Sequence, residues 1–236
     1  MIFDVAKVMH FSVEPTESIV KFSFSGYFRP EMYNSLWLVQ TGIIDISESK
    51  ATEDHNIEET YRRFSYNFVT IVVKPDSFTI GISDYHAFDF LLDFTKSVFT
   101  IIKSLLTAKF ELFTNFHYKV TDKKVDDVLE IFQSRVNWNP IFDDNLRLDG
   151  VIVSSDNELK GIYLNTRVNL AKCGREKMED NIHIFIRYTI FPKIPPRHKE
   201  KVIEPKLQFL GYDKQLLKMR HKTESIVEFL LSSYIL

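Results

Sequence analysis

Apolar and polar residues alternate along much of this chain with the two-residue period of a β-strand. Successive side chains of a strand point to opposite faces of a sheet, so each alternating stretch predicts a strand with one apolar face. The clearest case is residues 181–190, where every second side chain is a large apolar one: Ile182, Ile184, Ile186, Tyr188 and Ile190. The same reasoning predicts strands at residues 5–13, 17–25, 42–47, 61–73, 77–83, 109–120, 146–154, 159–170 and 181–191.

Other stretches repeat their apolar residues every three or four positions, which is the period of an α-helix. Residues 86–105, 122–137 and 212–232 are predicted helices, the last with a polar interruption at residues 220–225. A short helix is expected at residues 29–37, because Pro30 suits a first helical turn. The polar residues 48–60 predict a loop, and turns are expected at residues 74–77 and 154–158.

This order of elements predicts an α+β fold with a mostly antiparallel sheet and helices packed on one face. Strands, a hairpin and a closing helix occur in residues 1–107, and a similar order occurs in residues 108–236. We therefore hypothesise two structurally similar halves that arose by internal duplication. The junction near residue 107 has no Gly/Ser-rich linker, so we expect residues 1–236 to form one compact body.

Composition narrows the functional classes. The 236 residues carry a formal net charge of −2, so no global field attracts nucleic acid or an anionic membrane. A single cysteine excludes an intrachain disulfide framework and a Cys-based zinc site. No stretch approaches the roughly 20 apolar residues of a membrane span, and the N-terminus lacks the pattern of a secretory signal. We therefore expect a cytoplasmic protein with no membrane partner.

The glycines are too dispersed for the usual phosphate-binding loops. No two lie close enough for a G-x-G-x-x-G turn or a Walker loop, and the G-x-S-x-G and H-E-x-x-H motifs are also missing. We expect no cofactor. The seven glycines occupy positions 26, 42, 81, 150, 161, 174 and 211.

His86, Asp89 and Asp93 have the spacing of one helix face and are the first candidates for a metal site or a catalytic cluster. The same spacing continues through Lys96, so the simpler interpretation is a polar stripe facing solvent. Acidic residues at its start also suit the helix dipole, and Asp84 is placed to cap the helix. We expect no metal here.

Two further candidates have simpler explanations. Asp149 followed by Glu158 and Lys160 matches the residue types of a magnesium-dependent nuclease, but Glu158 is expected in a turn, so an ordinary hairpin is favoured. Cys173 has basic neighbours that would lower its pKa, but it has no identified histidine partner and is interpreted as a loop cysteine.

A binding face is predicted from strand alternation. If the apolar sides of the strands all meet the helices, the polar sides gather on the opposite face of the sheet. Arginine can hold a phosphate or carboxylate with two bonds, so such a face suits an anionic or acidic partner; the alternative is an ordinary solvent-facing surface. The candidate binding residues are Arg63, Asn67, Arg167, Asn169, His183 and Arg187.

The missing catalytic motifs, together with long aromatic strands whose edges can pair, favour a non-enzymatic protein-interaction or assembly subunit of a cytoplasmic complex. Its partner would be another protein or a second copy of itself. The alternative is a nucleic-acid-binding or RNA-processing protein built from two ferredoxin-like halves. Nucleases of that kind can use a histidine base without a metal, but the glycine-rich C-terminal loop that they carry is missing here.

Overall fold

The computed structural model describes residues 13–58, 60–102, 109–121, 124–134, 150–159, 162–172, 181–192 and 213–232. Within them, nine strands form one continuous sheet in which every neighbouring pair is antiparallel. The strands are β1 (Val13–Ser25), β2 (Thr52–Glu58), β3 (Tyr61–Tyr66), β4 (Val69–Lys74), β5 (Ser77–Ile82), β6 (Lys109–Val120), β7 (Gly150–Leu159), β8 (Ile162–Lys172) and β9 (Asn181–Pro192).

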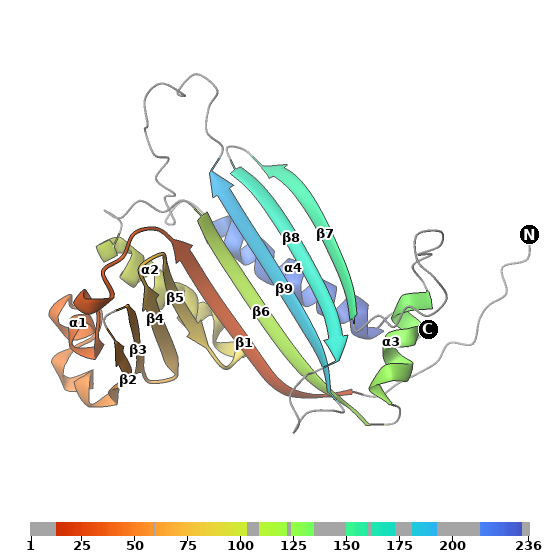
Figure 1. Cartoon of the computed structure of the whole chain (residues 1–236), viewed down its shortest axis with the longest axis horizontal. Helices are drawn as coiled ribbons and strands as arrows, with labels where there is room; N and C mark the ends of the chain where they lie inside the picture. The colour runs from red at the N-terminus through yellow and green to blue at the C-terminus, as the bar shows by residue number, and fades with distance from the viewer. Residues whose placement is uncertain are drawn as a thin grey trace, which may run out of the picture.

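The strand order across the sheet is β2-β3-β4-β5-β1-β6-β9-β8-β7 (Figure 1). Strands β1 and β6 are long neighbours at the centre, and their register runs from the pair Val13 and Val120 to the pair Ser25 and Lys109. On each side of this central pair, the chain forms a meander whose last strand returns to the centre. The sheet therefore continues unbroken from the first half of the chain into the second.

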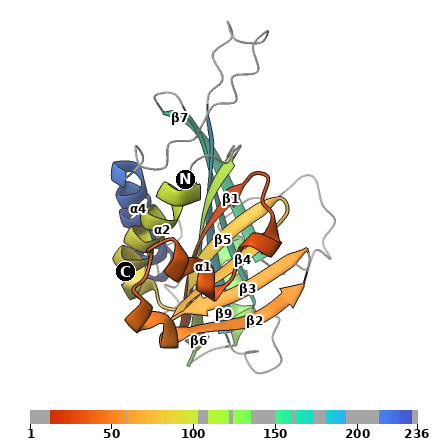
Figure 2. The same ribbon diagram turned by 90° about the vertical axis from the view of Figure 1, so that its left-hand side faces the viewer.

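Helices pack on one face of the sheet, as Figure 2 shows for α2 and α4. Phe22 and Phe24 of β1 contact α2 through Phe88 and Phe99, at ring-centroid distances of 5.8 and 5.2 Å. The buried hydroxyl of Thr223 in α4 donates to Tyr188 Oη of β9 at 3.1 Å. The α-helices are α1 (Ser35–Gln40), α2 (Phe88–Ile102), α3 (Val125–Ser134) and α4 (Asp213–Ser232).

The core follows from the alternation of the strands. Every second residue of the central strands is buried against the helices, and aromatic rings fill the seam between β1 and β6, where Phe110 contacts both Phe22 and Phe24. Burying one such side chain contributes on the order of 2–3 kcal/mol. The seam thus joins the two halves by apolar packing as well as by backbone hydrogen bonds. The α+β class, the antiparallel sheet and the placement of helices on one face are confirmed.

Several predictions for the first half were wrong. Residues 42–47 do not form a strand. They lead into the 3-10 helix Ile46–Ala51, whose N-terminus Asp45 caps in a capping box. The polar residues 48–60 contain the edge strand β2, because pairing with β3 satisfies its backbone groups despite its low hydrophobicity. The predicted strand 61–73 is two strands, separated by a turn at Asn67 and Phe68.

In the second half, the predicted turn at residues 154–158 was wrong, since these residues pair with β8 inside β7. Helix α4 runs through residues 220–225 without interruption. Its polar residues there include Arg220 and Glu224, which bond to each other one turn apart. The expectations for residues 5–12, Asp149, Lys160 and Cys173 lie outside the described residues.

The two halves share an order of elements. Each begins with a long central strand (β1 or β6), continues through a helix (α1 or α3) and a meander, and ends with a helix on the covered face (α2 or α4). Internal duplication stays a hypothesis, because a shared order of elements does not establish common descent. That residues 1–236 form one compact body also stays a prediction.

Candidate binding face

The face of the sheet opposite the helices carries mostly polar and basic side chains. Cross-strand partners share a face, so the pairing registers show which residues meet there. Strand β1 presents Lys21 and Ser23 on this side, while its neighbours Val20, Phe22 and Phe24 are buried on the other. We call this side of the sheet the open face.

Four side chains form one row across the middle of the open face. Lys21 of β1 lies opposite Phe113 of β6, Phe113 lies opposite Arg187 of β9, and Arg187 lies opposite Arg167 of β8. These four positions lie on adjacent strands, so the row spans three strand spacings, roughly 14 Å. The row therefore places three cations and one aromatic ring side by side.

The charges of this row are poorly balanced. Arg167 and Arg187 face each other directly, an arrangement that destabilises a sheet because like charges repel. Arg187 Nε is buried and has no hydrogen-bond partner among the described residues. Glu111, two residues before Phe113 on the same face of β6, pairs with Lys109 at 3.1 Å and accepts a bond from Thr189 at 3.2 Å. An anion between the two guanidinium groups would offset their repulsion.

Aromatic rings lie beside the cations. Phe113 and Phe185 pack with their ring centroids 5.9 Å apart, and Asn115 and Asn169 flank Phe185 on either side in the register. One step further along the strands, His117 and His183 stack at 4.8 Å with nearly parallel rings. We name the set Lys21, Phe113, Asn115, Arg167, Asn169, Phe185 and Arg187 the central patch.

The structure brings together four of the six residues predicted for this face. Arg167, Asn169, His183 and Arg187 lie on the adjacent strands β8 and β9. Arg63 is on the open face but on β3, six strand spacings from β8, which is about 29 Å.

The placement of Asn67 on this face was wrong. Asn67 lies in the turn after β3 with φ of 52°, a left-handed conformation that Asn tolerates better than most residues. The alternation of β3 ends before it, at Tyr66. Lys21 and Phe113 were missed, because alternation assigns a residue to a face but does not indicate which strands become neighbours.

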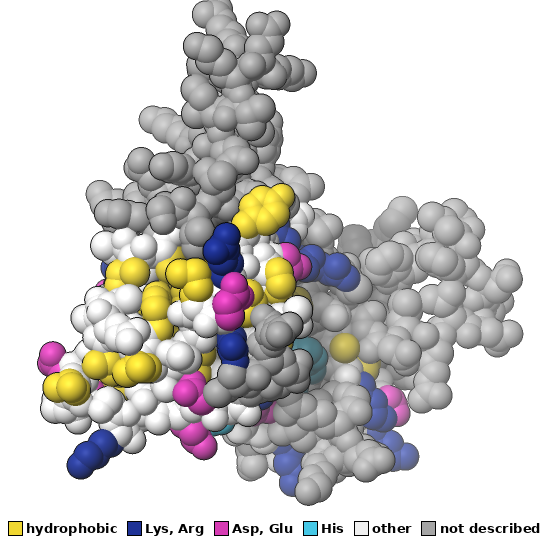
Figure 3. Space-filling model, turned by 60° about the vertical axis from the view of Figure 1, so that its left-hand side comes forward, with side chains coloured by type: hydrophobic (Ala, Val, Ile, Leu, Met, Phe, Trp, Pro, Cys, Tyr) yellow, Lys and Arg dark blue, Asp and Glu magenta, His cyan; other side chains and the backbone are white. Residues whose placement is uncertain are grey.

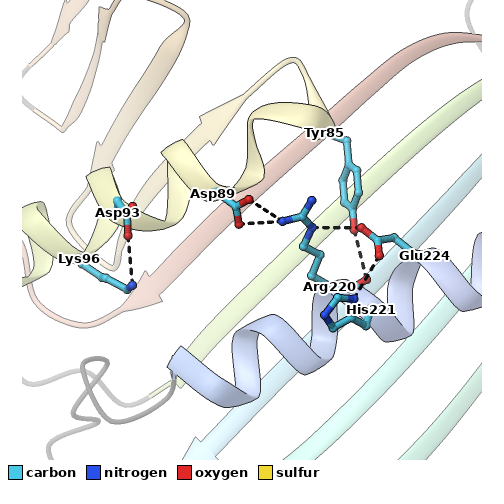
Figure 4. Close-up of polar contacts among 7 residues, drawn as sticks. All are labelled: Tyr85, Asp89, Asp93, Lys96, Arg220, His221 and Glu224. Atoms are coloured by element: carbon cyan, nitrogen blue, oxygen red, sulfur yellow. Dashed lines mark hydrogen bonds and ion pairs between the residues drawn. The ribbon is translucent and has the colours of Figure 1, made fainter.

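On the covered face, the stripe of α2 takes part in a contact between the halves (Figure 4). Arg220 of α4 donates from Nη1 to both carboxylate oxygens of Asp89 at 2.7 Å and from Nε to Glu224 at 3.1 Å. The Asp93 carboxylate accepts a bond from Lys96 Nζ, one turn along the same helix, at 3.2 Å. The stripe is exposed at both Asp89 and Asp93, as predicted, but Asp89 also pairs with a cation of the other half.

The start of α2 confirms another expectation. The Asp84 carboxylate accepts a bond from the backbone N–H of His86 at 2.9 Å, and so caps the 3-10 helix Tyr85–Ala87 that leads into α2. Tyr85 Oη donates to the Arg220 carbonyl oxygen at 3.3 Å. Burial raises the pKa of Tyr85 above its usual value, and the nearby Glu224 raises it further. No group of three or more His, Cys, Asp and Glu side chains in the described ranges could hold a metal ion.

A pocket of about 670 Å³ lies beside this contact, between the start of β1, the 3-10 helix at Tyr85 and α4. Four carboxylates, Glu17, Asp84, Glu224 and Glu228, line it together with Arg220, whose charge is already engaged by Asp89 and Glu224. Its electrostatics are therefore opposite to those of the central patch and do not suit an anion.

The sequence matches no protein-family model. No curated protein matches it at a significant level. Among the described helices, none is long and apolar enough to cross a membrane.

Proposed function

We propose that this protein binds a single-stranded nucleic acid on the open face of its sheet. The observation that carries the proposal is the row Lys21, Phe113, Arg187 and Arg167, in which cations flank an aromatic ring on four adjacent strands. Proteins that bind single strands combine a basic surface along the backbone with aromatic side chains on which the bases stack. The central patch offers both.

A single strand fits this surface better than a duplex. A base can lie against the paired rings of Phe113 and Phe185 only if its own face is uncovered, as it is in an unpaired strand. Asn115 and Asn169 beside the rings carry amide donors and acceptors for base edges. The nearby guanidinium groups of Arg167 and Arg187 would each gain a phosphate partner.

The proposal concerns binding and includes no catalytic step. Nucleic-acid binding is thus proposed without RNA cleavage. A cytoplasmic location is kept as part of the proposal.

The test is fluorescence anisotropy with labelled single-stranded DNA and RNA of about 15 nucleotides, within the range of known site sizes. If Lys21, Arg167 and Arg187 each contact one phosphate, the slope of log affinity against log salt is about −2. Affinity then falls about 18-fold between about 50 and about 200 mM salt. In Arg167→Gln/Arg187→Gln the slope falls to about −0.7, and the same salt change costs about threefold.

Two further variants separate the contributions. Arg29→Gln/Lys50→Gln removes the same charge from exposed positions outside the patch and should preserve affinity and slope. Phe113→Leu keeps an apolar side chain but removes the ring, and should weaken binding about tenfold. The proposal is wrong if no single strand binds at low salt, or if the control double variant loses as much affinity as the patch variant.

A second candidate function is self-association or binding to another protein, which was the leading expectation from the sequence. A different surface supports it. Phe68 and Phe90 are 54% and 40% exposed, and their rings lie 5.0 Å apart between the β3–β4 turn and α2. Figure 3 shows exposed hydrophobic side chains among charged ones on this side of the molecule. The edge strand β2 lies in the same half, and an unpaired edge can accept a strand from another chain.

Light scattering coupled to size exclusion tests self-association. A dimer that becomes a monomer in Phe68→Ser/Phe90→Ser would support this candidate. A wild-type protein that is monomeric at all concentrations would exclude self-association through this surface.

A further inference from the structure

A second feature of the open face lies in the first half of the sheet, where the surface forms a hollow of about 330 Å³. Strands β1, β3, β4 and β5 provide its walls and floor. Its lining combines two cations, hydroxyl groups and small apolar side chains, and includes no carboxylate among the described residues: Ile19, Lys21, Tyr61, Arg63, Thr70, Val72, Thr79, Gly81, Ile82 and Ser83.

Lys21 and Arg63 reach this hollow from opposite sides. Their strands, β1 and β3, are separated by β5 and β4, so their backbones lie three strand spacings apart, roughly 14 Å. Both side chains are exposed and long, and both line the hollow. A group bound between them would therefore contact two positive charges from two directions.

Gly81 has no side chain, and this leaves room for the Lys21 side chain to lie across the sheet. The two residues are paired in the register of β1 and β5. A Cβ atom at position 81 would lie 2.8 Å from Lys21 Cγ, closer than van der Waals contact permits. Any other residue here would push the Lys21 side chain aside and raise the floor of the hollow.

The remaining lining provides hydrogen bonds and an apolar surface. Thr70 and Thr79 present hydroxyl groups, and Thr79 Oγ1 lies 3.0 Å from Ser23 Oγ. Lys74 Nζ lies 5.9 Å from the ring centroid of Tyr61, which adds a third cation near the rim. Hydroxyl and ammonium groups around an anion are a common phosphate-binding combination.

We propose that this hollow binds a terminal phosphate, carried as a phosphomonoester at the end of the nucleic-acid strand that occupies the central patch. The ligand class rests on the proposed function. Lys21 belongs to both the patch row and the hollow, so a strand on the patch can end in the hollow without leaving the open face. The two subsites thus form one continuous anionic path.

The charge of the lining selects a monoester over an internal phosphodiester. A phosphomonoester carries a charge of about −1.5 to −2 at neutral pH, because its second pKa is about 6. A phosphodiester in the chain carries a charge of −1. Lys21 and Arg63, with no carboxylate in the lining, match the dianion. The volume of the hollow lies at the lower end of ligand pockets, which suits one phosphate and part of its nucleotide.

The experiment compares oligonucleotides of one sequence that carry a 5′-phosphate, a 3′-phosphate or no terminal phosphate. The wild-type protein should bind one phosphorylated form about fivefold to tenfold more tightly than the unphosphorylated one, as charge-assisted bonds at a partly exposed site allow. Arg63→Gln should abolish this ratio while retaining affinity for the unphosphorylated strand. Arg29→Gln, an exposed arginine elsewhere, should keep the ratio.

Gly81→Ala is a second variant that retains every charge, and it should reduce the ratio by displacing Lys21. Circular dichroism and urea unfolding confirm that each variant is folded. If the wild type binds all three oligonucleotides equally, the hollow is not a terminal-phosphate site, although the proposed function stands.

A further measurement distinguishes failure of the hollow as a phosphate site from failure of the proposed function. A mononucleotide with a 5′-phosphate, titrated by calorimetry, tests the hollow without the patch. If no oligonucleotide binds but the mononucleotide binds in an Arg63-dependent manner, the hollow is supported and the proposed function is wrong. If neither ligand binds, both proposals are wrong.

Discussion

Asp89 and Asp93 provide a matched pair of substitutions for measuring how strongly the two halves are joined on the helical face. Both are exposed acidic residues of α2, with side-chain exposures of 66% and 78%. Asp89 accepts two bonds from Arg220 of α4, whereas Asp93 pairs with Lys96 of its own helix at 3.2 Å. The same change to Asn therefore removes a contact between the halves in one case and a local contact in the other.

The expected losses differ for physical reasons. An exposed ion pair contributes about 0.2–1 kcal/mol, and the upper end applies to Asp89 because both its oxygens bond to one guanidinium. Asp89 also lies in the first turn of α2, where a negative charge interacts with the helix dipole for about 0.3–1 kcal/mol. We expect Asp89→Asn to cost about 1–1.5 kcal/mol. Asp93→Asn should cost about 0.3 kcal/mol, typical of a pair within one helix.

Urea unfolding at low salt measures both losses. Arg220 also bonds to Glu224, and its guanidinium lies 5.5 Å from the Phe88 ring centroid. A double-mutant cycle with Asp89→Asn and Arg220→Gln separates the energy of the Asp89–Arg220 pair from these other contacts. The coupling should be about 0.5–1 kcal/mol and should shrink in high salt. Equal losses for the two Asn variants, or a coupling near zero, would refute this account of the contact.

Further outcomes follow from other residues. Burial raises the pKa of Tyr188 to about 12, so the folded state holds this proton more tightly than the unfolded chain, whose tyrosine pKa is about 10. The resulting stabilisation is present below pH 10 and is lost above it, so the free energy of unfolding falls by about 2 kcal/mol at pH 12. Urea unfolding of Tyr188→Phe should show a smaller loss of stability at alkaline pH. An unchanged loss would mean that other groups cause it. In the part of the chain that the structure describes, the buried Nε and Nη1 atoms of Arg62 have no hydrogen-bond partner, so Arg62→Met should be neutral or stabilising by about 1 kcal/mol; a destabilisation of similar size would contradict this. Asn67→Ala should lower the free energy of unfolding by about 1 kcal/mol because of the positive φ at this position, and the affinity for oligonucleotides should not change. A loss of affinity would show that Asn67 belongs to the binding face.

Much of the fold could be predicted from local patterns. The alternation in residues 109–120 predicted β6 with its observed bounds, and residues 181–191 differ from β9 by one residue. In these strands every second side chain must be buried for the strand to be stable, so burial is encoded directly in the sequence. The helix from His86 was also found, because Asp84 caps its start and its apolar residues repeat at the helical period.

The candidate site could be predicted only in part. Alternation assigned Arg63, Arg167 and Arg187 to the face away from the helices, which the pairing registers confirm. It did not indicate that Arg63 lies five strand spacings from Arg187 and six from Arg167, and it did not bring Lys21 and Phe113 into their row.

The sequence by itself determined which side of each long strand is apolar, because that choice depends on residues two positions apart. Tertiary structure decided which strands are neighbours and in what register, because pairing between β1 and β6 joins residues about ninety positions apart through backbone groups that every sequence shares. The same holds for the edge strand β2, whose polar residues become a strand only when β3 supplies the hydrogen bonds. The row of Lys21, Phe113, Arg187 and Arg167 therefore exists only in the folded sheet, since backbone pairing aligns side chains that no local pattern connects.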